Sequence, residues 1–430
     1  MRKYIVSFIF SIFGWSVSAQ LSSTGNYLLM PKISSLDTVQ VFLLNGITAN
    51  TEISYNGSGS SINWYKYNDL SHSISNLPYI SPDDGTGYVL NVDGKQTNIW
   101  VMDYQHYLPV FTSFDAENNP AIQCGQLNLI LNATVPTLNY QAPSGNRYTL
   151  PREFKIKYQT QTWTSTWQNV DTTMIVSLPA TQITVPAPLC NTTFTISGDQ
   201  YASQLGLQPV TFTGSMYNAV AVQCHITTSV TARTEKNEDM RPSASTPINY
   251  SAPIDVQFMS NANEPVAEFY KWEILKGNSL IISRTDKDHR YTFTQAGQYT
   301  VRLTASNANC NASDSIIVTV SQSAIYAPNV FTPNGDGFND EFRVAYRSII
   351  SFDCWVYNRW GRLVYHWNDP QKGWNGTING AKAAPGPYFY VIKALGSDYD
   401  PKSTPDPKTH LRLGEYVLKG DINLLRGKVN

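Results

Sequence analysis

The sequence is poor in charged residues and, beyond its first twenty positions, has no long apolar run. Only 15% of its 430 residues are charged, compared with about 25% in an average soluble protein. The net charge is −1 and no block of like charges occurs, so the composition excludes a basic surface for nucleic acid or for an acidic membrane. A membrane-spanning helix needs roughly 20 apolar residues. We therefore expect no transmembrane segment.

Cysteine is also scarce, and its spacing is not that of a metal site. The cysteines are Cys124, Cys190, Cys224, Cys310 and Cys354. Their odd number leaves at least one thiol unpaired, which fits an exported protein that does not depend on a disulfide framework. One disulfide among Cys124, Cys190 and Cys224 is one interpretation, and no disulfide among them is the other. Cys354 alternates with apolar residues and is predicted to be buried. No histidine stands at ligand spacing from a cysteine, so no metal site is predicted from these residue types.

The motifs of common catalytic sites are missing. There is no G-x-S-x-G, no H-E-x-x-H and no glycine-rich phosphate loop before a helix. His106 is predicted to be a strand-edge histidine rather than a base. We therefore predict that the chain is not an enzyme and needs no cofactor. A secreted hydrolase stays an alternative, because glycosidase carboxylates meet only in three dimensions; the candidates are Asp83 with Asp84, Asp115 with Glu117, and Glu238 with Asp239.

The first residues have the pattern of a secretory signal peptide. Arg2 and Lys3 precede an apolar run, residues 4–17, and small residues at Ser18 and Ala19 suit a cleavage site. We expect residues 1–19 to be removed, so that the mature chain begins at Gln20. Export through the periplasm to the cell surface or the medium follows as an expectation.

The rest of the chain is dominated by short β-type runs, and we predict an all-β protein of tandem immunoglobulin-like sandwiches that ends in a small β-sandwich sorting domain. Aromatic residues make up 12% of the chain, and runs of β-branched and aromatic residues are cut by Gly, Asn, Ser and Pro. Regular spacing of this kind suggests sandwiches over residues 20–118 and 119–250. Residues 234–253 are predicted to be an exposed loop or linker. Strands are expected near residues 38–44, 62–67, 87–92, 98–104, 126–135, 153–160, 173–178, 194–197 and 220–233.

Within residues 251–322, one stretch shows strict alternation of apolar and polar positions around a glycine. Tyr291-x-Phe293 is followed by Gly297-x-Tyr299-x-Val301-x-Leu303, which places these side chains on one buried sheet face. This hairpin and the Trp272 strand resemble a PKD-type immunoglobulin-like domain. The G-D-G that usually follows the tryptophan is missing.

Residues 327–342, APNVFTPNGDGFNDEF, concentrate turn-forming residues between apolar anchors. Pro328 and Pro333 restrict the backbone, and Asn334-Gly335 and Asp336-Gly337 favour turns with positive φ. We predict a rigid loop at the start of the last domain, residues 323–430.

This domain resembles the gliding-motility-associated C-terminal domain, the type B sorting signal of the Bacteroidota type IX secretion system. The matching blocks are the loop above, Asn358-Arg359-Trp360-Gly361, a W-D-G-like turn at residues 374–376, the strand at residues 386–392, and residues 420–426. Asn375 replaces the usual Asp, and residues 396–413 are an insertion. The resemblance implies that outer-membrane type IX components are partners. The residues it marks as sorting candidates are Pro328, Asn329, Pro333, Asn334, Gly335, Asp336, Gly337, Asn339, Asp340, Asn358, Arg359, Trp360, Gly361, Gly420 and Arg426.

Two further features have a functional and a structural interpretation. Asn334, Asp336 and Asp340 offer the oxygen ligands that calcium prefers, but an Asx-turn loop satisfied by its own backbone is favoured. Trp64-Tyr65-x-Tyr67 and Trp163-x-x-x-Trp167 would stack on sugars if exposed, but core packing is favoured at strand spacing.

Together these observations predict an exported, non-enzymatic, multi-domain cell-surface protein with an adhesive, structural or binding role. Its ligand would be a surface glycan or a protein. A carbohydrate-binding module is the first alternative, and it predicts that Trp64 or Trp163 lies exposed on a flat sheet face. The hydrolase is the second, with its carboxylates within residues 22–115 or 124–233.

Overall fold

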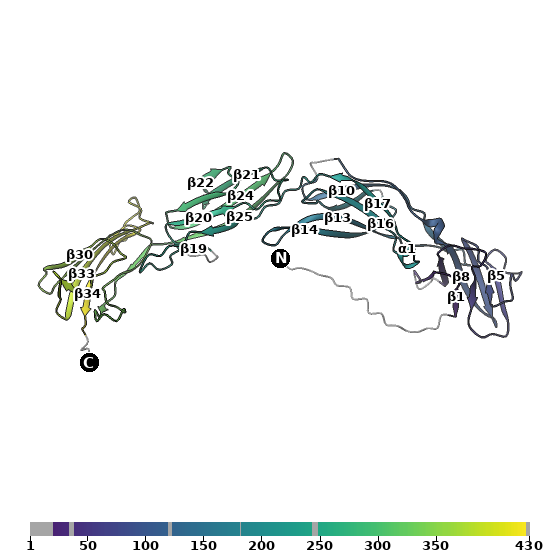
Figure 1. Cartoon of the computed structure of the whole chain (residues 1–430), viewed down its shortest axis with the longest axis horizontal. Coiled ribbons are helices and arrows are strands. Elements are labelled where there is room, and N and C mark those ends of the chain that lie inside the picture. Colours follow the sequence, from purple (N-terminus) through teal and green to yellow (C-terminus); the bar gives the residue numbers. More distant parts are fainter. Residues whose placement is uncertain (1–19, 34–37, 119–122, 181, 243–247, 427–430) are drawn as a thin grey trace. The chain divides into compact units, whose positions relative to one another are not determined.

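The computed structural model describes residues 20–33, 38–118, 123–180, 182–242 and 248–426, which form two compact units. The first unit contains the described residues up to Thr162 together with Gln168–Ala219, and the second contains Trp163–Trp167 and the described residues from Val220 onward. Strands make up 54% of the described residues and helices 2%, and Figure 1 shows arrows almost throughout. The all-β prediction is confirmed. The predicted signal peptide, residues 1–19, lies outside the described residues.

The first unit begins with an N-terminal sandwich. Its larger sheet has the strand order β2-β3-β8-β7-β5, and its smaller sheet has the order β1-β4-β6. Between them lies a core that contains the fully buried side chains of Phe42, Trp64, Tyr88 and Ile99. The strands are β1 (Leu21–Ser23), β2 (Tyr27–Met30), β3 (Val39–Leu44), β4 (Ile53–Tyr55), β5 (Ile62–Lys66), β6 (Tyr79–Ile80), β7 (Thr86–Val92) and β8 (Lys95–Asp103), after which comes the 3₁₀ turn Tyr104–Tyr107.

A second sandwich completes the first unit. The sheet β15-β10-β9 packs on the sheet β14-β13-β16-β17 around Phe114, Phe154 and Phe194. Buried and exposed residues alternate along β13 and β16. Because successive side chains of a strand point to opposite faces, each strand has one face that packs in the core. The strands are β9 (Val110–Ala116), β10 (Gln126–Thr134), β13 (Glu153–Trp163), β14 (Trp167–Ser177), β15 (Gln182–Pro186), β16 (Thr192–Gly198) and β17 (Val210–Tyr217).

A further core joins the two sandwiches within this unit. The hairpin of β11 (Leu138–Gln141) and β12 (Arg147–Leu150) and the helix α1 (Gln200–Gln204) cover the β3–β8 side of the first sheet. At its centre Arg152 forms a buried ion pair with Asp199, whose carboxylate also accepts a hydrogen bond from the Tyr104 hydroxyl. Because both charges are buried, removing either partner would leave the other uncompensated.

The second unit begins with a third sandwich, whose boundary corrects the prediction. Its sheets are β18-β20-β23 and β19-β25-β24-β21-β22, packed around Phe258, Trp272 and Phe293. Because β18 pairs with β20, the chain from Val220 belongs to this sandwich and not to a second domain that ends at residue 250. The strands are β18 (Thr227–Val230), β19 (Asn249–Ser251), β20 (Ile254–Met259), β21 (Phe269–Lys276), β22 (Ser279–Arg284), β23 (His289–Phe293), β24 (Gly297–Ser306) and β25 (Asn311–Ser321).

The predicted exposed linker, residues 234–253, is also corrected. Glu238 is buried and accepts hydrogen bonds from Arg233 at 2.7 Å and from the Ser251 hydroxyl. The backbone of Asp239 donates to the carbonyl oxygen of Tyr346 at 2.8 Å. The sequence shows the charges and turn residues of this segment, but the contacts that order it come from distant residues.

The cysteines settle one of the open interpretations. Cys190, Cys224 and Cys354 are free thiols, so no disulfide forms among Cys124, Cys190 and Cys224. Cys354 is fully buried, as predicted. Burial raises the pKa of the Cys354 thiol, which disfavours the thiolate.

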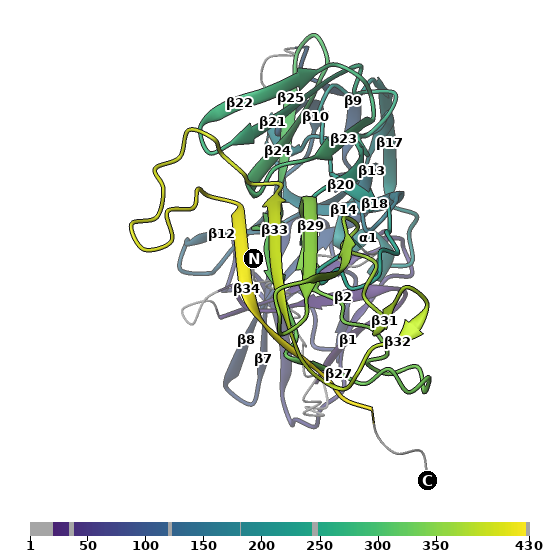
Figure 2. The same ribbon diagram turned by 90° about the vertical axis from the view of Figure 1, so that its left-hand side faces the viewer.

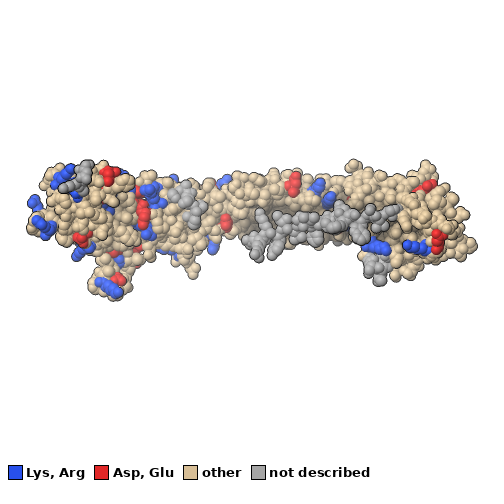
Figure 3. All heavy atoms as spheres, turned by 90° about the horizontal axis from the view of Figure 1, so that it is seen from below, with Lys and Arg blue, Asp and Glu red and all other residues tan. Residues whose placement is uncertain are grey.

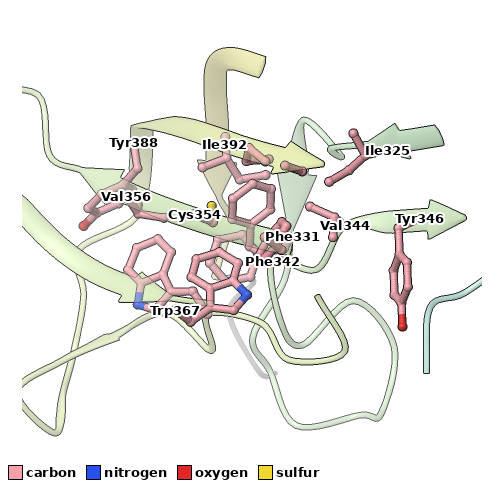
Figure 4. Packing of buried hydrophobic residues seen from close by; sticks show 14 of the residues in the cluster. Ile325, Phe331, Phe342, Val344, Tyr346, Cys354, Val356, Trp367, Tyr388 and Ile392 are labelled. Atoms are coloured by element: carbon pink, nitrogen blue, oxygen red, sulfur yellow. The ribbon is translucent and has the colours of Figure 1, made fainter. Parts of the chain in front are cut away.

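The C-terminal domain is a five-stranded sheet, β27-β34-β33-β29-β30, with two small two-stranded sheets, β26-β28 and β31-β32. Figure 4 shows Phe331, Phe342, Cys354 and Trp367 converging in its core. The strands are β26 (Ala324–Tyr326), β27 (Val330–Phe331), β28 (Ala345–Arg347), β29 (Ile349–Tyr357), β30 (Leu363–Trp367), β31 (Thr377–Ile378), β32 (Ala381–Lys382), β33 (Gly386–Gly396) and β34 (Glu415–Leu424). Within the residues described, no helix has both the length and the apolar character to cross a membrane.

Candidate recognition site in the C-terminal domain

Strand register brings the separated sequence motifs to one end of the C-terminal sheet. Tyr357, just before the N-R-W-G turn, pairs with Phe389, and Gly386 at the start of β33 pairs with Leu424 at the end of β34. Leu424 is also the partner of Phe331, from which the chain enters the N-G-D-G loop. We call this end of the sheet, with the N-G-D-G loop (residues 334–337), the N-R-W-G turn (358–361) and the W-N-G turn (374–376), the signature end. Figure 2 shows β29, β33 and β34 side by side, with β27, β31 and β32 near their lower end.

The N-G-D-G loop is held by its own side chains. The Asp340 carboxylate accepts backbone N–H groups of Gly335 at 2.7 Å and Gly337 at 2.8 Å, and these bonds lower the pKa of Asp340. The Asn334 side-chain oxygen accepts the N–H of Asp336 at 3.0 Å. Gly335 and Gly337 have φ of 86° and 88°, values that glycine adopts without strain. The Asx-turn interpretation is confirmed by these bonds.

Arg426 ties this loop to the neighbouring turn and hairpin. Its guanidinium donates to the carbonyl oxygens of Gly376 at 2.8 Å, Pro333 at 3.2 Å and Ala383 at 3.3 Å. Gly376 has a φ of 73°, and a Cβ there would lie only 3.0–3.2 Å from Leu424, Pro333 and Arg426. The close approach of three segments therefore requires glycine at position 376.

The N-R-W-G turn presents an aromatic ring to solvent. The Asn358 side-chain oxygen accepts the N–H groups of Trp360 and Arg362, each at 3.0 Å. Gly361 adopts a φ of 77°. Trp360 is 75% exposed, and the Arg359 guanidinium lies 4.1 Å from its ring centroid. An exposed tryptophan on a hydrogen-bonded turn contributes nothing to the core and is available to a partner.

The W-N-G turn has the opposite character. Trp374 is fully buried, donates from its indole N–H to Thr377 at 2.8 Å and packs 5.4 Å from the Phe331 ring. Asn375, where the family has Asp, accepts the backbone N–H and hydroxyl of Thr377. The amide oxygen thus forms the turn without a charged group.

A groove of about 550 Å³ opens beside the loop, within the second unit. It is lined by Pro328, Val330, Asn339, Asp340 and Arg343, among others. Val330 belongs to the edge strand β27 and is 40% exposed. An edge strand beside a groove can accept a further strand through backbone hydrogen bonds. Sequence reasoning did not find Val330 or Arg343, because neither belongs to a turn motif.

The structure also shows the contacts of Asn329 and Gly420 and the position of the insertion, residues 396–413. Asn329 accepts a hydrogen bond from the Asn423 backbone at 2.9 Å through its carbonyl oxygen. Gly420 lies opposite Tyr390, and a Cβ there would clash with the Tyr390 ring. The insertion leaves the sheet at Gly396, which pairs with Ile349 at the end opposite the signature end. The insertion therefore does not cover the candidate site.

The tryptophans proposed for sugar stacking do not form exposed platforms. Trp64 is fully buried, and its indole N–H donates to Leu77 at 3.0 Å. Trp163 is half-buried and stacks on His225 at a centroid distance of 5.2 Å. The favoured interpretation, core packing, is confirmed for Trp64. The exposure that the carbohydrate-binding alternative requires is absent there, and one ring face of Trp163 is covered by His225.

The candidate acids are engaged in structural contacts. Each of the six has a hydrogen-bond or ion-pair partner at 2.6–3.1 Å, and Glu238 lies in the corrected linker. His106 lies 2.7 Å from Asp84 and is exposed; this bond raises the pKa of the imidazole. The described residues contain no group of three or more His, Cys, Asp or Glu side chains arranged to hold a metal ion. The partners are Asp83 with Lys66, Asp84 with the Asp103 backbone, Asp115 with Ser215, Glu117 with Asn128, Glu238 with Arg233, and Asp239 with Arg347.

Three protein-family models match successive parts of the chain. Residues 116–213 match a fibronectin type III domain, residues 244–320 a PKD domain, and residues 325–405 the CHU_C type IX secretion signal domain. The expected sorting and PKD domains are thereby confirmed. A type IX secretion signal domain indicates an exported protein, at the cell surface or outside the cell, that interacts with the type IX machinery. Domains of these types are typically non-catalytic.

Two solved structures resemble the chain at low identity. The chicken CNTN1 FN1-FN3 domains are 9% identical with a TM-score of 0.23, and the match covers 74% of this chain and 97% of that one. Three N-terminal domains of the bacteriophage RB49 Highly Immunogenic Outer Capsid protein are 11% identical with a TM-score of 0.20, covering 74% and 100%. No curated protein matches the chain.

Proposed function

We propose that the protein is a surface adhesin or binding protein, and that the signature end of its C-terminal domain is the surface that the type IX machinery reads. The observation that carries the second part is the position of Arg426, whose guanidinium holds the N-G-D-G loop, the W-N-G turn and the following hairpin together. These bonds connect two of the motifs and the hairpin through one side chain, which supports the proposal that they act as one surface.

Exposure supports this assignment. Trp360 and Phe338 are 75% and 77% exposed, although large aromatic side chains usually serve a core. Exposed aromatic residues on preorganised turns are typical anchors of protein interfaces, because few conformations are lost on binding. The fixed loop and the turn of Asn358 provide that preorganisation.

The adhesive part rests on the other domains. Fibronectin-type and PKD-type sandwiches precede the signal domain, and the candidate acids already have structural partners. Figure 3 shows a mostly uncharged surface on the face in view, with charged side chains most frequent toward the left end and sparse over the middle. A succession of such sandwiches along the chain suits a binding protein held outside the cell better than an enzyme.

The test is the location of the protein in a strain with a working type IX system. The full chain, a chain truncated after Gln322, and the Trp360→Ala variant are compared by fractionation and protease shaving of intact cells. We expect the full chain at the surface and both altered chains in the periplasm. Equal surface levels of all three would contradict the recognition role of the signature end.

A further inference from the structure

The outer face of the first sheet carries aromatic side chains that the covering hairpin leaves open. Strand alternation turns Trp64 inward and Tyr65 and Tyr67 to the opposite face. On that face Tyr67 is hydrogen-bonded through its N–H to Gly87, which pairs in turn with Trp100. The two rings are 6.1 Å apart. The aromatic motif found in the sequence therefore does reach an open face, through Tyr65 and Tyr67 and not through Trp64.

Glycine at position 87 makes this arrangement possible. A Cβ there would lie 2.3 Å from the Tyr67 ring, so any larger residue would displace the tyrosine from the sheet. Tyr67 and Trp100 are both half-buried. Each is thus fixed by packing and still presents part of its surface.

A groove of about 400 Å³ lies against these rings. Its other walls include Asn68, Thr86 and Gln141, the last from strand β11 of the hairpin that covers the first sheet. Across the described part of the chain, neither the Asn68 nor the Gln141 amide makes a side-chain hydrogen bond. Lys66 at the rim is paired with Asp83 at 2.7 Å, so the groove carries no uncompensated charge.

We propose that this groove binds a neutral oligosaccharide. Its size is in the range of small-ligand sites, about 300–1,000 Å³. Aromatic rings pack against the C–H face of a sugar ring through apolar contact, while amide groups can both donate to and accept from hydroxyl groups. Tyr65, two residues before Tyr67 on the same face, extends the aromatic surface along the strand. The inference deepens the proposed adhesive function by naming a ligand class and a site for it.

Other classes of ligand fit the groove less well than a neutral sugar. An acidic glycan or a nucleic acid needs free cationic groups, and the one lysine at this groove is neutralised by Asp83. A peptide strand needs free backbone groups at a sheet edge. The edge strand here is β5, but the Trp64 N–H and carbonyl groups already bond Ser75 and Ile74, and the rings lie on the sheet face. A neutral sugar needs only the flat rings and the amides that are present.

The test is isothermal titration of the chain from Gln20 to its end with cellohexaose, xylohexaose and mannohexaose. We expect at least one of these probes to bind. Tyr67→Leu, which retains cover over Gly87 but removes the flat ring, should raise the Kd about tenfold or more. The double variant Asn68→Ala/Gln141→Ala should do the same. Tyr79→Leu, at an exposed tyrosine of the other sheet, is the matched control and should leave the Kd unchanged.

Absence of binding by all three sugars at millimolar concentration would overturn the inference, as would an unchanged Kd in both groove variants. Preference for a charged glycan such as heparin would also overturn it. The outcome is separable from the proposed function. If the chain reaches the surface and adheres to cells equally well with Tyr67→Leu, the groove is wrong and the adhesin stands. If sugar binding depends on Tyr67 but the chain stays in the periplasm, the groove assignment stands and the proposed surface function is wrong.

Discussion

Arg426 donates a hydrogen bond from Nη2 to the carbonyl oxygen of Gly376 at 2.8 Å, across 50 positions of the sequence. The same guanidinium reaches Pro333 and Ala383. A single side chain near the end of the described residues thus bonds to three separate segments of the domain.

Replacing this arginine should loosen the loop. With Arg426→Gln we expect a local loss of about 1–3 kcal/mol, because carbonyl groups lose a charged donor. Amide hydrogen exchange at Gly335 and Gly337, whose N–H groups bond Asp340, should become at least about tenfold faster. Lys419→Gln, at an exposed position of β34, the strand that precedes Arg426, controls for the lost charge. Unchanged exchange in Arg426→Gln would mean that the loop is held by Asp340 alone.

The two tryptophans of the signature motifs should respond in opposite ways. Trp374→Ala removes a fully buried ring and should cost about 3–5 kcal/mol of unfolding free energy. Trp360→Ala removes a ring that is 75% exposed and should change stability by less than about 0.5 kcal/mol. Urea denaturation followed by circular dichroism measures both. A large destabilisation by Trp360→Ala would show that its role is structural and remove the basis for its recognition role.

Calcium should not stabilise the loop. The Asp340 carboxylate oxygens already accept two backbone N–H groups, and Asn334 and Asp336 bond one another. We expect the Tm of the chain to be the same in 2 mM EDTA and in roughly millimolar calcium, the range in which extracellular calcium sites are half-filled. A rise in Tm with calcium that disappears in Asp340→Asn would revive the calcium site.

Alkaline pH should destabilise the first unit. Burial, and next the nearby Asp199, raise the pKa of Tyr201 to about 12, whereas an unfolded tyrosine has a pKa of about 10. Below pH 10 both states are protonated and the contribution is fully present. Between pH 10 and 12 the unfolded state loses its proton first, so stability falls as the pH rises.

Thermal unfolding at a series of pH values measures this effect. Tyr201→Phe should make the fall between pH 10 and 12 shallower. It should also cost about 1 kcal/mol at neutral pH, because the hydroxyl donates to Pro151 at 2.8 Å. The exposed Tyr79→Phe serves as control. An unchanged slope in Tyr201→Phe would show that other groups account for the alkaline loss.

The segment that precedes β19 should depend on Glu238. Glu238→Ala leaves the half-buried Arg233 without the partner that lies at 2.7 Å, and we expect a loss of about 3 kcal/mol or more. Limited trypsin digestion should then cut after Lys236 at least about tenfold faster. Lys271→Ala removes one member of an exposed ion pair with Glu273 and should leave the digestion rate unchanged. Equal protease resistance in Glu238→Ala would mean that the backbone contacts with Tyr346 suffice.

The repetitive features of the fold could be predicted from local patterns. Period-two alternation marks β13, β16 and β24 because each strand buries one face, and the predicted strand at residues 62–67 corresponds to β5. The turn residues of the loop predicted its Asx bonds, because Asn and Asp bond backbone groups only two to five residues away. Where partners are distant, as for Glu238 with Ser251 and Tyr346, local patterns predicted an exposed linker and were wrong.

The sequence by itself determined that this is an all-β chain with a rigid turn-rich loop and a C-terminal domain of the type IX signal kind, because strand periodicity and turn chemistry act over a few residues. Only the tertiary structure decided that Tyr67 and Trp100 flank a groove, and that Arg426 joins three turns. The physical reason is that strand register and packing between segments far apart in the chain select which face of each strand meets solvent, and no local pattern encodes that choice.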